Sequence, residues 1–557
     1  MLQLRLRFAV VLLFAAAMPA MGAGAVASTS LYVVRHDRWS RDDEHDYSAF
    51  IQAIGDSDCG SLDACLRSPA NPFNGTDAPD YRFESDCADL PYVLRFYFAW
   101  KRGLPFSYVS AVTTADSTSE DIRYSHAGNK VAARSDVPGG VSSGYRIIER
   151  IRAEVSSATY RIHPDARRAL YADFYSPAID PKSIKPGTVV YDPAGHVAIV
   201  YRVDPDGRVH CFDAHVDYTL TQMVFDVRFA RMRPADGAGF KNWRPITLVG
   251  AKTMQDGSLR GGHIRPAANA ELGDFSLEQY YGTGARPADE AWASGGFTAG
   301  GERLDFYDFV RARLGGGKLV FDPLKEVHDT TWSICSDLYY RSLTVELARR
   351  NGIAQAPHPG RLPGNIYGTD GDWETYSTPS RDARLKTVFK ALRDAVERFV
   401  EMDARKDTAH LSYAGDNLAA DMLKAYSQVE RYCVVDYRRS DGSVARLSYE
   451  AARKRLFAMS FDPYHCPELR WGATDAAELS TCPDDAIKQS WYAAEQNLRN
   501  QIERTYDARM DFNLAELQAP GPGKGVGSPP DTDVRSYLES VMKRSGGEVQ
   551  PEPARLP

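Results

Sequence analysis

The chain has 557 residues, of which 43% are hydrophobic and 25% are charged. At roughly 100–200 residues per domain, this length predicts two to four domains with real hydrophobic cores. The formal net charge is −7 at pH 7, and the sequence contains no long basic run. Such a mildly acidic, mixed surface gives no reason to expect a nucleic-acid partner and favours solubility.

The first residues have the pattern of an export signal. Arg5 and Arg7 precede an apolar run over residues 8–20, which is followed by small residues. A basic start, an apolar centre and a small-residue cleavage region define a secretory signal peptide. We therefore expect a signal peptide over residues 1–27, cleavage near Ser28, and an exported protein, periplasmic or secreted. The alternative is a membrane anchor, but the run is short for a full span, and we expect no stable membrane insertion after cleavage.

Export changes the meaning of the eight cysteines, because disulfides persist in oxidising compartments. Two pairs lie close together in turn-rich segments, and a third pair spans the helical half of the chain. The expected disulfides are Cys59–Cys65, Cys466–Cys482 and Cys335–Cys433. Cys87 and Cys211 remain, and a disulfide between them would leave neither thiol free to act as a nucleophile. Connectivity cannot be derived from sequence, so this pairing is a hypothesis.

Residues 28–250 alternate helical and strand-like segments. Residues 90–100 are apolar and aromatic and end at a basic turn followed by Gly103, which predicts a buried helix. Residues 107–145 are polar and predict a long loop or insertion. Residues 147–156 predict a second helix.

A strand series follows. A short strand is predicted over residues 188–191 and a stronger one over residues 196–203. Asp204-Pro205-Asp206-Gly207 predicts a hairpin turn, since glycine tolerates the positive φ that such turns need, and residues 208–213 return as the partner strand. A helix followed by antiparallel strands indicates an α+β domain.

The second half of the chain has a different character. Residues 251–320 are rich in glycine and predict a connection with some local structure. Residues 321–517 predict a mainly helical domain of unknown role, in which apolar residues recur at helical spacing over residues 385–402, 419–432 and 487–510. Residues 518–557 predict a Pro/Gly linker and a disordered tail, with a short amphipathic stretch over residues 533–542.

Two short segments suggest nucleophilic chemistry. Cys87 is expected on the first turn of the apolar helix, and His196 opens the strong strand. A helix N-terminus and a neighbouring imidazolium both lower a thiol pKa by stabilising the thiolate. The charges of Asp86 and Asp89 oppose the thiolate, although Asp89 would favour the helix N-terminus. Together the two segments suggest a cysteine hydrolase.

A third polar group should orient the imidazole. The candidates on the returning strand are His210, Asp213 and His215. Counting outward from the turn, the residue opposite His196 lies near the far end of this strand, which favours Asp213 and His215. These two also share one face of the strand, whereas His210 lies on the other.

These motifs resemble those of a known superfamily. Asp86-Cys87-Ala88-Asp89-Leu90 resembles the nucleophile motif of NlpC-type cell-wall peptidases, and Pro186-Gly187-Thr188-Val189-Val190 resembles the Pro-Gly-Asp strand entry of the same superfamily. The run from Gly195 to Val200, then Asp206-Gly207-Arg208-Val209 and Asp213-Ala214-His215, is similar to the CHAP amidase pattern. The resemblance covers residues 80–105 and 184–216.

The resemblance implies a papain-like fold with an antiparallel sheet for residues 28–250, and hydrolysis of amide bonds in peptidoglycan peptides. It implies Cys87 as nucleophile and His196 as base. Asp213 falls where the families have an acidic residue, and His215 falls where CHAP proteins carry asparagine. Thr188 stands where the families usually have aspartate, and the span from Cys87 to His196 is longer than is common.

Other chemistry has less support. Residues 333–340 repeat the Cys, Asp, Leu order of the first motif, but no Gly-His strand follows, so Cys335 is interpreted as structural. The sequence has no His-Glu-x-x-His, paired Cys-x-x-Cys, Walker or dinucleotide-binding pattern, so neither a metal nor a cofactor is expected. A metal cluster of His210, Asp213 and His215 is disfavoured because His210 faces away. The rival functions are an amidase or acyltransferase acting on a non-wall substrate, and a catalytically inactive periplasmic binding or scaffold protein.

Overall fold

The computed structural model describes residues 30–57, 59–166, 170–193, 196–366, 371–502 and 510–546. The predicted signal peptide over residues 1–27 and the end of the predicted tail, residues 547–557, lie outside the described residues. So do Ala194 and Gly195, which belong to the turn predicted before His196.

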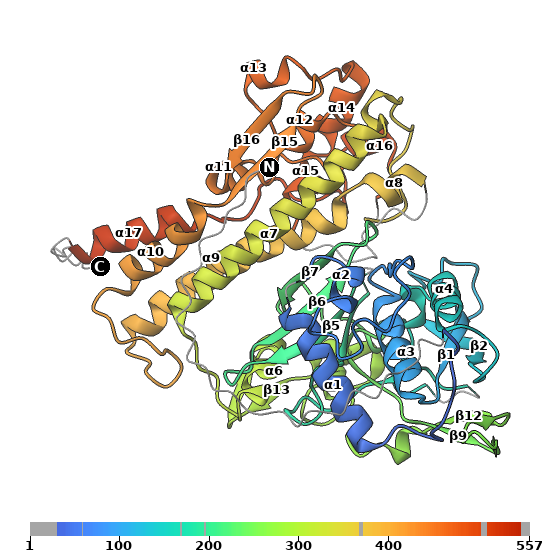
Figure 1. Ribbon diagram of the computed structural model, residues 1–557. Coiled ribbons are helices and arrows are strands. Elements are labelled where there is room, and N and C mark those ends of the chain that lie inside the picture. Colours follow the sequence, from blue (N-terminus) through green and yellow to red (C-terminus); the bar gives the residue numbers. More distant parts are fainter. Residues whose placement is uncertain are drawn as a thin grey trace.

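A six-stranded antiparallel sheet forms the centre of the first half of the chain (Figure 1). Its strands, in spatial order, are β3 (Phe174–Tyr175), β8 (Gly239–Trp243), β4 (Val189–Asp192), β5 (His196–Val203), β6 (Val209–Ala214) and β7 (Leu220–Val224). The predicted hairpin over residues 196–213 is confirmed, because β5 and β6 pair with Ile199 opposite Phe212. With its helices the molecule has a mixed α and β architecture with antiparallel sheets.

The two faces of the sheet belong to two different hydrophobic cores. Val197 and Ile199 of β5 join the core that contains α3, whereas Ala198 and Val200 join the core that contains the long helices of the second half. Successive side chains of a strand point to opposite faces, so both faces of β5 are buried. The sheet is therefore a central layer with different partners on its two sides.

Three helices accompany the sheet on the first side: α1 (Arg41–Asp56), α3 (Leu90–Arg102) and α4 (Gly144–Glu154). The predicted helix over residues 90–100 is confirmed as α3, in which every residue from Leu90 to Trp100 is buried. The helix ends at Gly103, whose left-handed φ of 68° suits a residue without a Cβ atom. The helix predicted over residues 147–156 is confirmed as α4.

The prediction of a loop over residues 107–145 is wrong in part. β1 (Ser107–Thr114) and β2 (Asn129–Asp136) form an antiparallel hairpin there. The first residues of β1 are buried, but the middle of β1 and most of β2 are partly or fully exposed. The sequence of the hairpin therefore lacks a run of apolar residues that would indicate a strand facing the core. The polarity of an exposed hairpin led to the misassignment.

The glycine-rich segment after the sheet folds into small elements. They are β9 (Ile246–Val249), β10 (Lys252–Thr253), β11 (Leu259–Arg260), β12 (His263–Pro266), α5 (Glu278–Tyr281), β13 (Phe297–Ala299), β14 (Glu302–Leu304) and α6 (Phe306–Leu314). The short helix α2 (Leu62–Leu66) is not part of this segment and follows α1. β9 pairs with β12, β10 with β11, and β13 with β14. The expectation of some local structure in this connection is confirmed.

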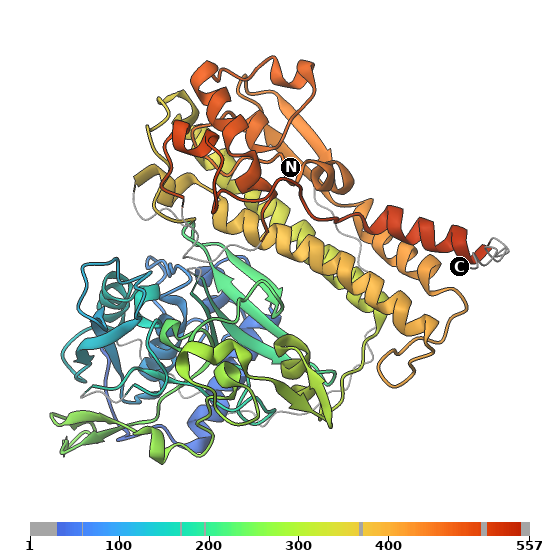
Figure 2. The same ribbon diagram turned by 180° about the vertical axis from the view of Figure 1, so that it is seen from behind.

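Two long helices, α7 (Pro323–Arg350) and α9 (Pro379–Ala404), dominate the second half and lie along the α/β part (Figures 1 and 2). α10 (Leu418–Glu430) and α17 (Val534–Gly546) extend this bundle, and α9 and α10 confirm the helices predicted over residues 385–402 and 419–432. The shorter helices are α8 (Gly371–Tyr376), α11 (Tyr449–Arg455), α12 (Pro467–Arg470), α13 (Ala476–Leu479), α14 (Ala486–Ala494), α15 (Gln496–Asn500) and α16 (Leu514–Gln518).

One hairpin in this half was not predicted, and one prediction is wrong. A hairpin of β15 (Val434–Arg438) and β16 (Val444–Ser448) interrupts the helices. The single helix expected over residues 487–510 is instead α14 and α15, which end at Asn500, because the backbone of Gln501 is extended.

All three predicted disulfides are confirmed: Cys59–Cys65, Cys335–Cys433 and Cys466–Cys482. Cys87 and Cys211 do not take part in a disulfide. The structural interpretation of Cys335 is thereby confirmed. Of the helices that the structure describes, none is long and apolar enough to cross a membrane. Three disulfides are compatible with an exported protein.

Candidate functional site

Cys87 lies in a tight turn that leads into α3. The Leu90 N–H donates to the Asp86 carbonyl at 3.1 Å, and the Asp86 carboxylate accepts the N–H groups of Ala88 at 2.8 Å and Asp89 at 3.1 Å. Cys87 thus precedes the first helical residue, Leu90, by three positions. It does not lie on the first helical turn, where we expected it. Asp86 acts as the cap that binds the exposed N–H groups of this turn.

The surroundings of the thiol are unfavourable to a thiolate. Burial raises the pKa of Cys87, and the charges of Asp86, Asp213 and Asp89 raise it further, while a hydrogen bond from the Val197 backbone opposes them. Burial and the charge of Asp86 also raise the pKa of Asp89 to about 8, which leaves this carboxyl largely uncharged at pH 7. The contact with Val197 places the thiol beside the residue that follows His196 in β5.

His196 is the first residue of β5 and is bound to Asp213 of β6. Its Nε2 atom is hydrogen-bonded to Asp213 Oδ2, and the Thr221 hydroxyl of β7 donates to Asp213 Oδ1. Burial acts to raise the pKa of Asp213, but the charges of His215 and His196 and these hydrogen bonds hold it well below its usual range. Asp213 is therefore a fully buried carboxylate that orients the imidazole.

His215 lies next to this pair. Its Nε2 atom is 3.2 Å from Thr221 Oγ1 and 3.9 Å from Asp213 Oδ2, and its ring is 6.0 Å from that of His196. Burial lowers the pKa of His215 to about 4, so its ring is neutral at pH 7. His210 lies apart, hydrogen-bonded to Asp204 in the hairpin turn at 2.8 Å, as its position on the other face of the strand predicts.

The imidazole of His196 is directed to the side of the sheet that the long helices cover. By strand alternation His196 shares a face with Ala198 and Val200, and these two pack in the core of the long helices. A cavity of about 40 Å³ lies against His196 and His215. Tyr340 of α7 and Arg381 of α9 line its other side. This volume has room for no more than a few water molecules.

A larger cleft lies beside this cavity. It has a volume of about 540 Å³ and runs between the β6–β7 edge of the sheet and α7. Thr221, Met223 and Tyr340 line both the cleft and the small cavity. Trp332 of α7, which is 57% exposed, lines the cleft alone. Tyr340 therefore stands between the open cleft and the histidines.

The structure brings His196, Asp213 and His215 together and places Cys87 at the backbone of the adjoining Val197. Sequence reasoning missed Thr221, which lies directly opposite Asp213 in the register of β6 and β7. Extension of the hairpin by one strand identifies this position. Tyr340 and Arg381 were also missed, because no local signal links a distant helix to the strand that it covers.

Two groups of described residues bring potential metal ligands within 4.8 Å of one another, and both lie in the helical half. One contains Glu468 with Cys466 and Cys482, whose sulfurs form a disulfide that withdraws them from metal binding. The other contains His358, Asp462 and Glu495. Neither group includes a residue of the Cys87 and His196 region.

Comparison of the chain with known protein families, curated proteins and solved structures finds no match. The functional argument therefore depends on the geometry of the site and on its motifs.

Proposed function

We propose that the protein is an exported cysteine hydrolase of amide bonds, with Cys87 as nucleophile, His196 as base and Asp213 as the residue that orients the base. The observation that carries this proposal is the meeting of the Cys87 turn with β5 at Val197, one residue from a histidine that is bonded to a buried carboxylate. Acyl transfer by a cysteine needs a nucleophile, a base and a group that orients the base, and the three proposed residues come from three separate elements.

The roles follow from which atoms are engaged. Because His196 Nε2 is bonded to Asp213, the other ring nitrogen, Nδ1, is the atom that would take the thiol proton. The thiolate attacks the amide carbonyl, the Cys87 backbone N–H stabilises the oxyanion, and His196 returns the proton to the leaving amine. A water molecule activated by His196 then hydrolyses the acyl-enzyme. The charge of Asp213 favours the imidazolium that this cycle requires.

The finer assignments depend on the resemblance. A papain-like fold for the α/β part and a peptidoglycan stem peptide or crosslink as substrate are what NlpC-type and CHAP motifs imply. The open cleft of about 540 Å³ along the β6–β7 edge has room for a peptide-sized ligand, and Tyr340 separates it from His196. A non-wall amide substrate remains the alternative within the same reaction class.

A second candidate is a catalytically inactive binding or scaffold protein. The observation that favours it is the cover over the histidines: the cavity beside His196 holds about 40 Å³, and the charges around Cys87 oppose the thiolate. In this case the helical half would carry the binding function, and Cys87 would have no catalytic role.

Alkylation with iodoacetamide across a pH series, with peptide mapping, distinguishes the two candidates. A thiol whose pKa is raised reacts only at alkaline pH, whereas proton transfer to an imidazole gives a reactive fraction near neutral pH. For the hydrolase we expect Cys87 to react at pH 6–7 and the His196→Gln variant to lose this reaction. Cys211, buried in β6 and also outside the disulfides, is the internal control and should stay unreacted.

Digestion of purified sacculi by wild type and Cys87→Ala then tests the substrate. We expect the variant to lose activity by at least about 1000-fold, since the nucleophile is absent. A Cys87 that reacts only at alkaline pH, or a Cys87→Ala protein as active as wild type, contradicts the proposed mechanism. Activity on other amides without release of wall peptides would reject the wall substrate alone.

A further inference from the structure

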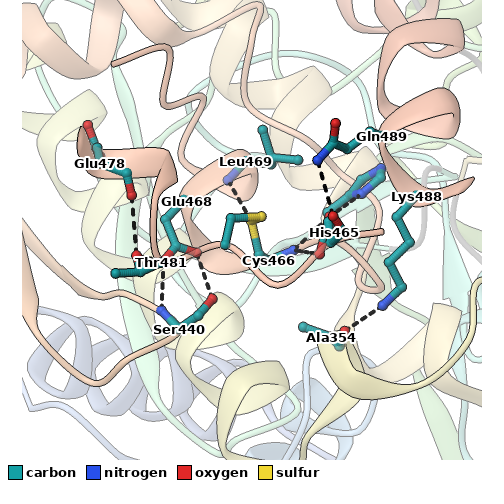
Figure 3. The surroundings of a disulfide bond; sticks show 12 residues. Ala354, Ser440, His465, Cys466, Glu468, Leu469, Glu478, Thr481, Lys488 and Gln489 are labelled. Carbon is teal, nitrogen blue, oxygen red and sulfur yellow. Dashed lines mark hydrogen bonds and ion pairs between the residues drawn. A yellow bond between two sulfur atoms is a disulfide. The ribbon is translucent and has the colours of Figure 1, made fainter. Parts of the chain in front are cut away.

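A second cluster of ionisable side chains lies in the helical half. One of its members, His465, directly precedes Cys466 of the Cys466–Cys482 disulfide (Figure 3). The cluster contains His358 from the loop after α7, Asp462 and His465 from the loop before α12, and Glu495 between α14 and α15. The side chains of all four are completely buried. Burial of this many charged and polar groups away from water is costly unless they bind one another or a cation.

Both imidazoles are anchored through Nδ1 and directed through Nε2 to one centre. His358 Nδ1 is 2.5 Å from the Pro359 carbonyl oxygen, and His465 Nδ1 is 3.0 Å from Asp484 Oδ2. On the inner side, His358 Nε2 is 2.6 Å from Asp462 Oδ2. Metal-binding histidines have this arrangement, in which the outer nitrogen donates to a carbonyl or carboxylate and the inner nitrogen is the ligand.

The remaining atoms of the centre lack hydrogen bonds. His465 Nε2 is 3.7 Å from Asp462 Oδ2 and 3.8 Å from Glu495 Oε2, both too long for a hydrogen bond. Within the part of the chain that the structure describes, His465 Nε2 and both carboxylate oxygens of Glu495 are buried without a hydrogen-bond partner. Such orphaned atoms in a folded protein require an explanation.

The charges of the cluster point to a cation. Asp462, Asp484 and Glu495 bring three carboxylates around two imidazoles, and Arg499 Nη1 approaches Glu495 Oε2 at 3.5 Å. If each Nδ1 carries the ring proton that it donates, both Nε2 atoms present lone pairs to carboxylate oxygens. Lone pairs that face each other across 2.6–3.8 Å repel unless a proton or a metal ion lies between them.

We propose that His358, Asp462, His465 and Glu495 bind one divalent transition-metal ion, with zinc as the first choice. Two imidazole nitrogens and two carboxylate oxygens suit zinc, which binds four such ligands at about 2.0–2.2 Å. Tetrahedral geometry at that distance separates neighbouring ligand atoms by about 3.3 Å. The ligand atoms of His358, Asp462 and Glu495 lie within 4.8 Å of one another. His465 Nε2 lies 3.7 Å from Asp462 Oδ2 and 3.8 Å from Glu495 Oε2, so the four side chains would have to move together around the ion to reach this spacing.

The site is structural and not catalytic. Its ligands have no exposed surface, so a substrate has no access to the metal. The ligands come from three segments that are distant in the sequence, and a metal ion would fasten the loop after α7 to the α12 and α14–α15 region. This role is independent of Cys87 and of the proposed hydrolase activity.

Metal content of the purified protein tests the proposal. We expect about one zinc or similar transition-metal ion per chain by plasma mass spectrometry, and a melting temperature that falls on dialysis against a chelator and returns on addition of zinc chloride. Glu495→Gln should reduce zinc affinity at least about 100-fold, since it removes a ligand charge and not a supporting contact. Its melting temperature should then no longer respond to chelator.

Two controls keep the result interpretable. His410→Gln changes a histidine that also contacts two carboxylates, Asp407 and Glu302, but that is partly exposed, and it should keep the full metal content. Without metal, Glu495→Gln should fold at least as well as the chelated wild type, because it removes a buried carboxylate with unpartnered oxygens. A protein that contains no metal and does not respond to zinc, or a Glu495→Gln variant that keeps its metal, overturns the proposal.

Discussion

At the scale of single residues, Cys87 and His215 show how burial sets the ionisation of this site. Burial raises the pKa of the Cys87 thiol and lowers that of the His215 imidazole to about 4, so burial favours the uncharged form of both groups. Asp213 is the exception, because two histidines and Thr221 stabilise its charge. Any imidazolium formed at His196 is therefore attracted to the buried charge of Asp213.

His215 should make the protein sensitive to mild acid. Its pKa is about 4 when folded, against 6.5 for an ordinary histidine, so the unfolded chain takes up a proton first as the pH falls. Stability is therefore complete above pH 6.5 and is lost progressively towards pH 4, by about 2 kcal/mol between pH 7 and pH 5. Urea unfolding at the two pH values should show this loss in wild type and its absence in His215→Asn.

The matched control is His328→Asn, a substitution of a histidine whose side chain is 47% exposed. This variant should keep the wild-type loss of stability between pH 7 and pH 5. An unchanged pH dependence in His215→Asn would show that His215 is solvated in the folded protein and that the cover by Tyr340 is open in solution.

At the scale of elements, the sequence predicted those structures that depend on residues within one short segment. The turn at residues 204–207 fixed the β5–β6 hairpin, Gly103 ended α3, and the short cysteine spacings indicated two of the disulfides. The exposed β1–β2 hairpin and the division of residues 487–510 were missed, since neither leaves an apolar period that differs from a loop or a helix. The face to which His196 points was also beyond prediction, because both faces of β5 are apolar.

The Cys335–Cys433 disulfide should contribute most among the three to the stability of the protein. It joins α7 to the end of α10 across 98 residues, whereas Cys59–Cys65 spans only 6. In the chain-entropy account the longer loop stabilises by about 4–5 kcal/mol and the shorter by about 2 kcal/mol. Urea unfolding of Cys335→Ala/Cys433→Ala and of Cys59→Ala/Cys65→Ala should show this order. Equal losses would mean that the unfolded chain is already compact around α7.

At the scale of the whole molecule, the helical half covers the histidines, and Tyr340 separates them from the open cleft. Tyr340→Ala should join the two spaces and expose His196 and His215. We expect diethyl pyrocarbonate to modify these histidines at least about 10-fold faster, at a stability cost of about 1–3 kcal/mol for the lost packing. Peptide mapping by mass spectrometry gives the rate for each histidine.

Tyr339→Ala is the matched control, because the neighbouring tyrosine is 56% exposed. It should leave both rates unchanged. Slow modification of His196 in Tyr340→Ala would show that Arg381 and the rest of α9 close the site without the tyrosine. Faster wall digestion by Tyr340→Ala would further identify the wild-type protein as a latent hydrolase.

Two features could not be predicted from motifs, because their residues are far apart in the sequence: the proposed metal site and the helices that cover His196. The ligands of the proposed metal site are spread from His358 to Glu495, and only Asp462 and His465 are close together in the chain. Likewise α7 and α9 reach His196 from more than a hundred residues away. Such contacts depend on how the helices pack, which composition and periodicity do not determine.

The order of the two halves along the chain has a consequence for the life of the molecule. In a chain translocated from its N-terminus, residues 30–250 arrive first, and a folding unit at that end forms before the rest has emerged. The face of β5 and β6 that carries His196 and Asp213 then stands uncovered until α7 and α9 follow, and the disulfide that holds α7 forms only when Cys433 arrives. His196 and His215 would thus pass through a brief period on every new molecule in which the long helices do not yet separate them from solvent.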